Sequence, residues 1–189
     1  MKNRISTLLI VAGALACASA LMDGMRPRVS PHETITATID GDEIKIVYGR
    51  PYSRNPNNTN EVRKIWGTLV PWGKAWRLGA DEATALITAQ PIVIGDTTVP
   101  AGTNRLYLVP METGTSKLAI NKKTGIWGIQ RDGSVDETED LARVDVKKEP
   151  MDKQVDQFTM AIEKNPAGGG IIKMMWEKTQ FSVAFTVKK

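Results

Sequence analysis

Short runs of alternating polar and apolar residues recur along this chain and restrict it to a β-sheet fold. In the clearest case, residues 34–39 alternate with a period of two, Asp40-Gly41-Asp42 makes a tight turn, and residues 43–48 return as the partner strand. About ten such runs follow one another at a spacing of roughly ten residues. The pattern predicts an all-β chain, a single β-sandwich or jelly-roll-like domain of mainly antiparallel strands.

The remaining strands are predicted from the same alternation, bounded by Gly, Pro and Asp residues. Residues 62–70 are interpreted as either a strand or one helical turn. Residues 165–170 form a Gly-rich turn. The other predicted strands cover residues 84–89, 92–94 with 97–99 as a hairpin, 105–109, 117–121, 126–129, 141–146, 157–163, and 171–176 with 181–187 as a closing hairpin.

The N-terminus has the pattern of an export signal. Lys2 and Arg4 precede an apolar run over residues 5–16, followed by small residues, and this run is too short for a convincing membrane span. Two processing routes fit: cleavage after Ala20, or lipidation of Cys17 at a loose lipobox. We therefore divide the chain into a signal peptide (1–20), a flexible leader (21–29) and one β-sandwich domain (30–189).

This organisation implies an exported protein, either periplasmic or secreted, with Cys17 as the only route to an outer-membrane lipid anchor. Removing residues 1–20 takes away two basic residues and no acidic one, so the net charge falls from +4 to +2. No stripe of Lys and Arg with interleaved aromatic residues is present, which argues against a nucleic-acid partner. The oligomeric state is left open.

The residue inventory excludes many kinds of chemistry. No G-x-S-x-G, P-loop or H-E-x-x-H motif occurs, and a single histidine rules out a multi-histidine metal site. Cys17 is the one cysteine, so the mature domain has no disulfide and no cysteine-based zinc site. We expect no metal, no cofactor and, on balance, no enzymatic activity.

His32 is the most chemically versatile titratable residue, because an imidazole acts as acid, base or ligand near neutral pH. We consider His32 and Glu82 as candidate catalytic residues, with Asp81 as the alternative carboxylate. The structural alternatives are a histidine bonded at the edge of the first strand and an acid paired with Arg77 or Arg50. We favour the structural alternatives.

Residues 49–84 hold three of the five Trp residues, and large aromatic side chains either fill a core or stack on ligands. We expect two of these three to be core and one, Trp72 or Trp76, to be accessible. The candidate ligand-binding residues are Arg50, Tyr52, Trp72, Trp76 and Arg77, with the arginines available for anionic groups.

Several segments together resemble one protein family: residues 30–32 (SPH), 39–41 (IDG), 48–51 (YGRP), 64–84 (KIWGTLVPWGKAWRLGADEAT), 100–102 (PAG), 127–128 (WG) and 140–143 (DLAR). Over nearly the whole mature chain, the sequence is similar to the bacterial "domain of unknown function 2911" family. The resemblance implies secreted or lipid-anchored bacterial proteins with a β-rich domain and no agreed activity. It transfers no catalytic residue, but its motifs contain His32, Arg50, Trp76, Arg77 and Glu82.

The preferred hypothesis is a non-enzymatic binding domain outside the cytoplasm, which holds a carbohydrate, a peptide or another cell-envelope ligand against residues 49–84. One alternative is a cell-wall-directed hydrolase that uses His32 with Asp81 or Glu82. The other alternative is a purely structural or interaction domain whose Trp residues are all core.

Overall fold

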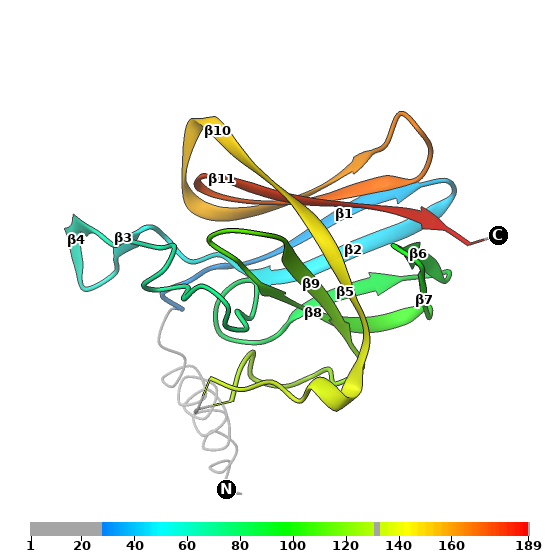
Figure 1. Cartoon of the computed structure of the whole chain (residues 1–189), viewed down its shortest axis with the longest axis horizontal. Helices are drawn as coiled ribbons and strands as arrows, with labels where there is room; N and C mark the ends of the chain where they lie inside the picture. Colours follow the sequence, from blue (N-terminus) through cyan, green and yellow to red (C-terminus); the bar gives the residue numbers. More distant parts are fainter. Residues whose placement is uncertain (1–27, 131–132, 189) are drawn as a thin grey trace, which may run out of the picture.

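The structure is a computed structural model that describes residues 28–130 and 133–188 (Figure 1). The predictions for residues 1–27, including cleavage after Ala20 and lipidation of Cys17, lie outside these residues. In the part of the chain that is described, no helix is long and apolar enough to cross a membrane.

The described residues confirm the all-β, mainly antiparallel class. Nine strands form one open sheet in the order β1-β2-β5-β8-β9-β10-β11-β6-β7, while β3 and β4 form a separate two-stranded sheet. The strands are β1 (His32–Ile39), β2 (Asp42–Gly49), β3 (Arg54–Asn55), β4 (Asn58–Val62), β5 (Thr84–Thr88), β6 (Ile92–Ile94), β7 (Thr97–Val99), β8 (Gly102–Val109), β9 (Ser116–Asn121), β10 (Asp140–Lys164) and β11 (Gly170–Val187), with one 3₁₀ turn, η1 (Glu137–Glu139).

The predicted first hairpin is confirmed as β1 and β2, which pair from His32 opposite Gly49 to Ile39 opposite Asp42. Asp40 and Gly41 both have positive φ, 50° and 90°, as a two-residue hairpin turn requires. The alternation places Ile44, Ile46 and Tyr48 in the core, while Glu43 is exposed and Lys45 and Val47 are half-buried. The hairpin β6-β7 is also confirmed.

Two long strands replace four predicted short ones. The runs at 141–146 and 157–163 belong to β10, which has 25 residues, and the predicted closing hairpin is wrong because residues 170–187 form the single strand β11. The polar residues at 177–180 lack a Gly or Pro turn. The strand therefore continues through these residues. A β-bulge-like irregularity lies at Glu177, which has φ 52° and pairs with Val155 where the β10-β11 register shifts.

Beyond Val62, the segment at residues 62–70, which was interpreted as a strand or one helical turn, is neither, and the predicted strand at residues 126–129 is absent from the described structure. Residues 63–70 form turns with an isolated bridge between Trp66 and Val70, because Gly67 at φ 81° reverses the chain. Residues 126–129 make an isolated bridge between Glu82 and Trp127 instead of a strand. There the Gly128 backbone packs directly against the Arg77 side chain, so a side chain at this position would meet Arg77.

β10 and β11 lie across β1 and β2 in Figure 1 and close the core from that side. An aromatic cluster occupies this core: Trp76 stacks on Trp176 with ring centroids 5.7 Å apart and meets Phe158 edge-on at 4.9 Å. Trp66 adds edge-on contacts to Trp76 at 5.9 Å and to Phe181 at 5.4 Å. Residues 49–84 are thus anchored to the sheet by their own Trp side chains.

Candidate functional site

Residues 49–84, the central loop, leave the sheet and return to it at nearly the same point. A Cβ at Gly49 would overlap the carbonyl oxygen of Ala80, and a Cβ at Gly79 would lie 2.8 Å from the carbonyl oxygen of Gly49. The Oγ1 of Thr84 donates to the carbonyl of Leu78 at 2.6 Å. These backbone contacts close the loop, so its interior side chains are held against the sheet.

A cavity of about 920 Å³ lies beneath this loop. Its apolar wall includes Tyr52, Leu69, Trp76 and Trp176, of which Tyr52 and Leu69 are each 43% exposed. The charged lining residues are the basic Arg54, Arg63, Lys74 and Arg77 and the acidic Asp81 and Glu137. An apolar wall with more basic than acidic groups suits a ligand that carries an anionic group.

The basic side chains that line the cavity differ in how many of their hydrogen-bond donors have partners within the protein. Arg77 donates to the carbonyl of Asp81 at 3.2 Å, and burial lowers the pKa of its guanidinium. Arg63 donates to the carbonyl of Tyr52 through Nη2, while its buried Nε has no partner among the described residues. Within the same residues, Lys74 is exposed and has no hydrogen-bond or ion-pair partner. Lys74 therefore keeps its donors for a ligand, whereas the buried Nε of Arg63 has no contact with solvent.

At one edge of the cavity, Arg28, His32, Asp81 and Glu82 form what we call the His32 cluster. The Nε2 of His32 lies 3.0 Å from Oε2 of Glu82 and 3.8 Å from Oδ2 of Asp81. Adjacent carboxylates on a regular strand would point to opposite faces. Here Asp81 has φ 62°, which breaks the extended backbone and lets both acids approach the same imidazole.

Arg28 controls the electrostatics of this cluster. Its Nη1 and Nη2 donate to the two carboxylate oxygens of Glu82 at 2.5 and 2.7 Å. This hydrogen bonding is the main cause that lowers the pKa of Glu82 to about 2 and raises the pKa of Arg28. Nη1 of Arg28 also lies 2.9 Å from Nε2 of His32. Because that nitrogen faces both a donor and a carboxylate, it either accepts from Arg28 or donates to Glu82.

The other predicted ligand-binding residues are not all at the cavity. Tyr52, Trp76 and Arg77 line it, although Trp76 is only 7% exposed. Arg50 instead donates to the carbonyl of Phe158 at 3.1 Å and to Thr159 Oγ1 at 2.9 Å, and so joins the end of β2 to β10. Trp72 stacks on Trp66, and Nζ of Lys148 lies 4.5 Å from its ring centre.

Sequence reasoning did not select Arg63, Lys74, Leu69 or Arg28. The first three lie in the central loop, so their position was a usable signal. Arg28 had no such signal, because its partner Glu82 is 54 positions away in the chain. Pairing at that separation depends on the fold.

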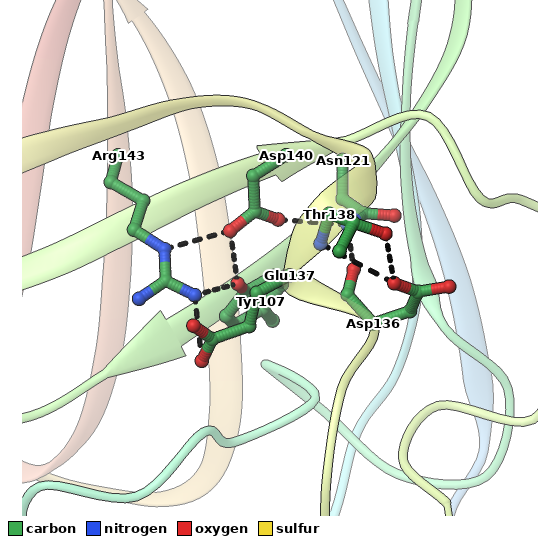
Figure 2. Close-up of polar contacts among 7 residues, drawn as sticks. All are labelled: Tyr107, Asn121, Asp136, Glu137, Thr138, Asp140 and Arg143. Atoms are coloured by element: carbon green, nitrogen blue, oxygen red, sulfur yellow. Dashed lines mark hydrogen bonds and ion pairs between the residues drawn. The ribbon is translucent and has the colours of Figure 1, made fainter.

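A second polar network, around Asp140, is structural (Figure 2). Asp140 accepts hydrogen bonds from the Tyr107 hydroxyl at 2.5 Å, from Asn121 Nδ2 at 2.7 Å and from Arg143 Nε at 2.7 Å. Arg143 also pairs with Glu137 at 2.8 Å. The polar groups of this network form hydrogen bonds and ion pairs with one another and fix η1 and the start of β10 against β8 and β9. The motif at residues 140–143 therefore serves the fold.

Comparison with known proteins identifies the family of this chain. Residues 30–185 match the family described as "Protein of unknown function (DUF2911)". Because the match covers most of the chain, the protein belongs to this family, as the resemblance in its motifs predicted. Comparison with curated proteins and with solved structures found no significant match.

Proposed function

We propose that this protein is a binding domain outside the cytoplasm, which holds an anionic cell-envelope ligand, such as a peptide or a glycan bearing carboxylate groups. The observation that carries the proposal is the cavity of about 920 Å³, which is lined by apolar side chains and by the basic residues Arg54, Arg63, Lys74 and Arg77. The export pattern of residues 1–20 supports the location.

The unsatisfied donors support an anionic ligand over a neutral one. Within the described residues, the exposed side chain of Lys74 has no protein acceptor. A carboxylate accepts several hydrogen bonds and is bound best by charged donors. The exposed side chains of Tyr52 and Leu69 offer apolar contact beside these donors.

A tryptophan-fluorescence titration tests this proposal, since Trp76 and Trp176 line the cavity and report on its occupation. The ligands are peptidoglycan fragments, short acidic peptides and neutral glycans of similar size. We expect a saturable change in fluorescence with the anionic ligands. In Lys74→Glu the dissociation constant should be at least about tenfold higher, because the reversed charge repels the ligand.

Lys178→Glu makes the same change on an exposed lysine of β11 that does not line the cavity, and should leave binding unchanged. No saturable response to any ligand would contradict the proposal and favour a purely structural domain. Equal affinity in Lys74→Glu would remove the cavity as the binding site.

A cell-wall-directed hydrolase is the second candidate, favoured by the distance of 3.0 Å between His32 Nε2 and Glu82 Oε2 beside a cavity that Asp81 lines. Such a carboxylate orients an imidazole that acts as a general base toward water. His32→Ala would then abolish turnover of the bound ligand while its affinity stays within about twofold. Turnover that is absent in the unsubstituted protein, or unchanged in His32→Ala, would exclude this candidate.

A further inference from the structure

Three side chains of the His32 cluster offer metal-ligand atoms to one point. Nε2 of His32 and one carboxylate oxygen each from Asp81 and Glu82 all lie within 4.8 Å of one another. Imidazole nitrogen with two carboxylate oxygens is a donor set that suits Zn²⁺ and related divalent ions. A single histidine excludes a multi-histidine site but is compatible with this mixed one.

A cationic group already contacts two of these ligand atoms. Nη1 of Arg28 lies 2.9 Å from Nε2 of His32 and 2.5 Å from Oε2 of Glu82. To accept from a guanidinium, Nε2 must carry its lone pair and no proton. That is the same protonation state in which imidazole binds a metal ion. The cluster is thus arranged around a positive charge, which Arg28 supplies.

Hydrogen bonds that do not involve Arg28 fix the backbone from Asp81 to Ala83, which carries the two carboxylates. The amide of Gly128 donates to the carbonyl of Asp81 at 2.9 Å, and the amide of Ala83 donates to the carbonyl of Ile126 at 3.0 Å. Arg77 adds a side-chain bond to the carbonyl of Asp81 at 3.2 Å. On the opposite side, His32 is fixed by its pairing with Gly49 at the start of β1.

The Arg28 contact is easy to exchange. The side chains of Arg28 and Glu82 are 51% and 40% exposed, and exposed ion pairs contribute little to stability because solvent screens them. A divalent cation carries twice the charge of a guanidinium and would bind all three ligand atoms directly. A metal ion would therefore displace the arginine rather than bind beside it.

We propose that His32, Asp81 and Glu82 form a binding site for one divalent transition-metal cation of the Zn²⁺ class, and that the Arg28 side chain competes for it. Three protein ligands leave a coordination position for water or for an anionic group. Because Asp81 also lines the cavity, this site adjoins the cavity. The proposal does not depend on the cavity ligand and stands or falls on cation binding alone.

The test is calorimetric titration of ZnCl₂ into the full chain, in a Cys17→Ser background that removes the one thiol. We expect one Zn²⁺ per chain with micromolar affinity, and much weaker binding of Mg²⁺ and Ca²⁺. His32→Ala and Glu82→Gln should each weaken Zn²⁺ binding at least about tenfold, whereas Glu112→Gln, an exposed matched control, should not.

Arg28→Ala distinguishes a competing arginine from an inert neighbour. Removal of the competing guanidinium should tighten Zn²⁺ binding several-fold, while Lys147→Ala, which removes an exposed, ion-paired cation on β10 that does not line the cavity, leaves it unchanged. As a second readout, the single imidazole gives one set of ring ¹⁵N signals, and its Nε2 signal should shift on Zn²⁺ addition.

Several results would overturn the proposal. Zn²⁺ affinity that is unchanged in both His32→Ala and Glu82→Gln, or an imidazole signal that does not shift, rules out the site. Unchanged or weaker affinity in Arg28→Ala rules out the competition. Circular dichroism of each variant verifies that the fold is retained, and Asp81→Asn provides a further ligand substitution if either of the first two variants is unfolded.

Discussion

Gly49 shows how a missing side chain shapes this protein. The residue ends β2 and opens the central loop, and a Cβ placed on it would overlap the carbonyl oxygen of Ala80 near the other end of the same loop. The obstructing atom belongs to the backbone, so no side-chain rotation relieves the overlap. Close approach of two backbone segments, rather than an unusual φ, is the reason for glycine at this position.

We expect Gly49→Ala to lower the free energy of unfolding by about 2–3 kcal/mol, because overpacking at a backbone contact forces the loop away from the sheet. Gly114→Ala is the control: Gly114 has φ 84° and open space around it, so its loss of about 1 kcal/mol is conformational alone. Urea denaturation measures both. Equal losses of unfolding free energy in the two variants would contradict this expectation and show that the loop accommodates the Cβ at residue 49.

At the scale of elements, the Tyr48 hydroxyl joins β2 to β1 and β10. It donates to Oε2 of Glu33 at 2.7 Å and accepts from the amide of Met160 at 2.9 Å, while its ring meets Phe158 edge-on at 5.7 Å. The side chain is 1% exposed. A buried hydroxyl with two partners is a strong link only while it keeps its proton.

Burial raises the pKa of Tyr48 to about 12, which makes this link sensitive to alkaline pH. An unfolded tyrosine has a pKa of about 10, so the folded state favours the neutral phenol. Its stabilisation is complete below about pH 10 and is lost as the pH rises through about 12. Absorbance of the phenolate should therefore show a late titration step that Tyr48→Phe removes.

Tyr48→Phe should also lower the free energy of unfolding at neutral pH by about 1–2 kcal/mol, because the buried amide of Met160 loses its acceptor. Burial and a hydrogen bond to Asp140 also raise the pKa of Tyr107, so Tyr107→Phe is a suitable comparison. An alkaline titration that is identical with and without Tyr48 would contradict the expectation.

At the scale of the whole molecule, the Trp residues divide by environment. Trp76 and Trp176 are buried, Trp66 and Trp72 are half-buried within the same aromatic cluster, and Trp127 is 60% exposed. Residues 49–84 were expected to contribute one accessible Trp, but the exposed Trp lies outside them. The cluster connects the central loop to β10 and β11, so the loop and the sheet share one core.

Trp127→Phe should remove most of the tryptophan emission that iodide quenches and shift the remaining spectrum to the blue, because the other four rings are buried or half-buried. Steady-state fluorescence with and without iodide measures this. Trp72→Phe is the matched control and should leave most of the quenchable emission. Loss of that emission in the control instead would show that the central loop opens in solution.

Local sequence patterns were sufficient for the all-β class, the β1-β2 and β6-β7 hairpins and most strand positions. Alternation and turn residues act between neighbours, so these features need no knowledge of distant contacts. The wrong strand predictions also arise because these patterns report only on neighbouring residues. The break at residues 177–180 resembled a turn, yet pairing with β10 carries β11 through it, because cross-strand hydrogen bonds outweigh a weak local signal.

The candidate site was visible in part. Tyr52, Trp76 and Arg77 were chosen from the central loop and line the cavity, and His32 and Glu82 are in contact. Arg50 and Trp72 look equally suitable in the sequence, but neither lines the cavity. Which of several similar side chains faces a cavity depends on the backbone direction at each residue, and neighbouring residue types carry little information about that.

Composition, periodicity and turn chemistry thus place this chain among all-β proteins, because those properties act over a few residues. Tertiary structure alone brings Arg28 to Glu82 across 54 positions and Arg50 to Thr159 across 109. It also sets Asp81 at φ 62°, so that both adjacent carboxylates face one imidazole. Such contacts exist only after burial of the shared core has offset the entropy of ordering the intervening chain, so the site arises from the complete fold.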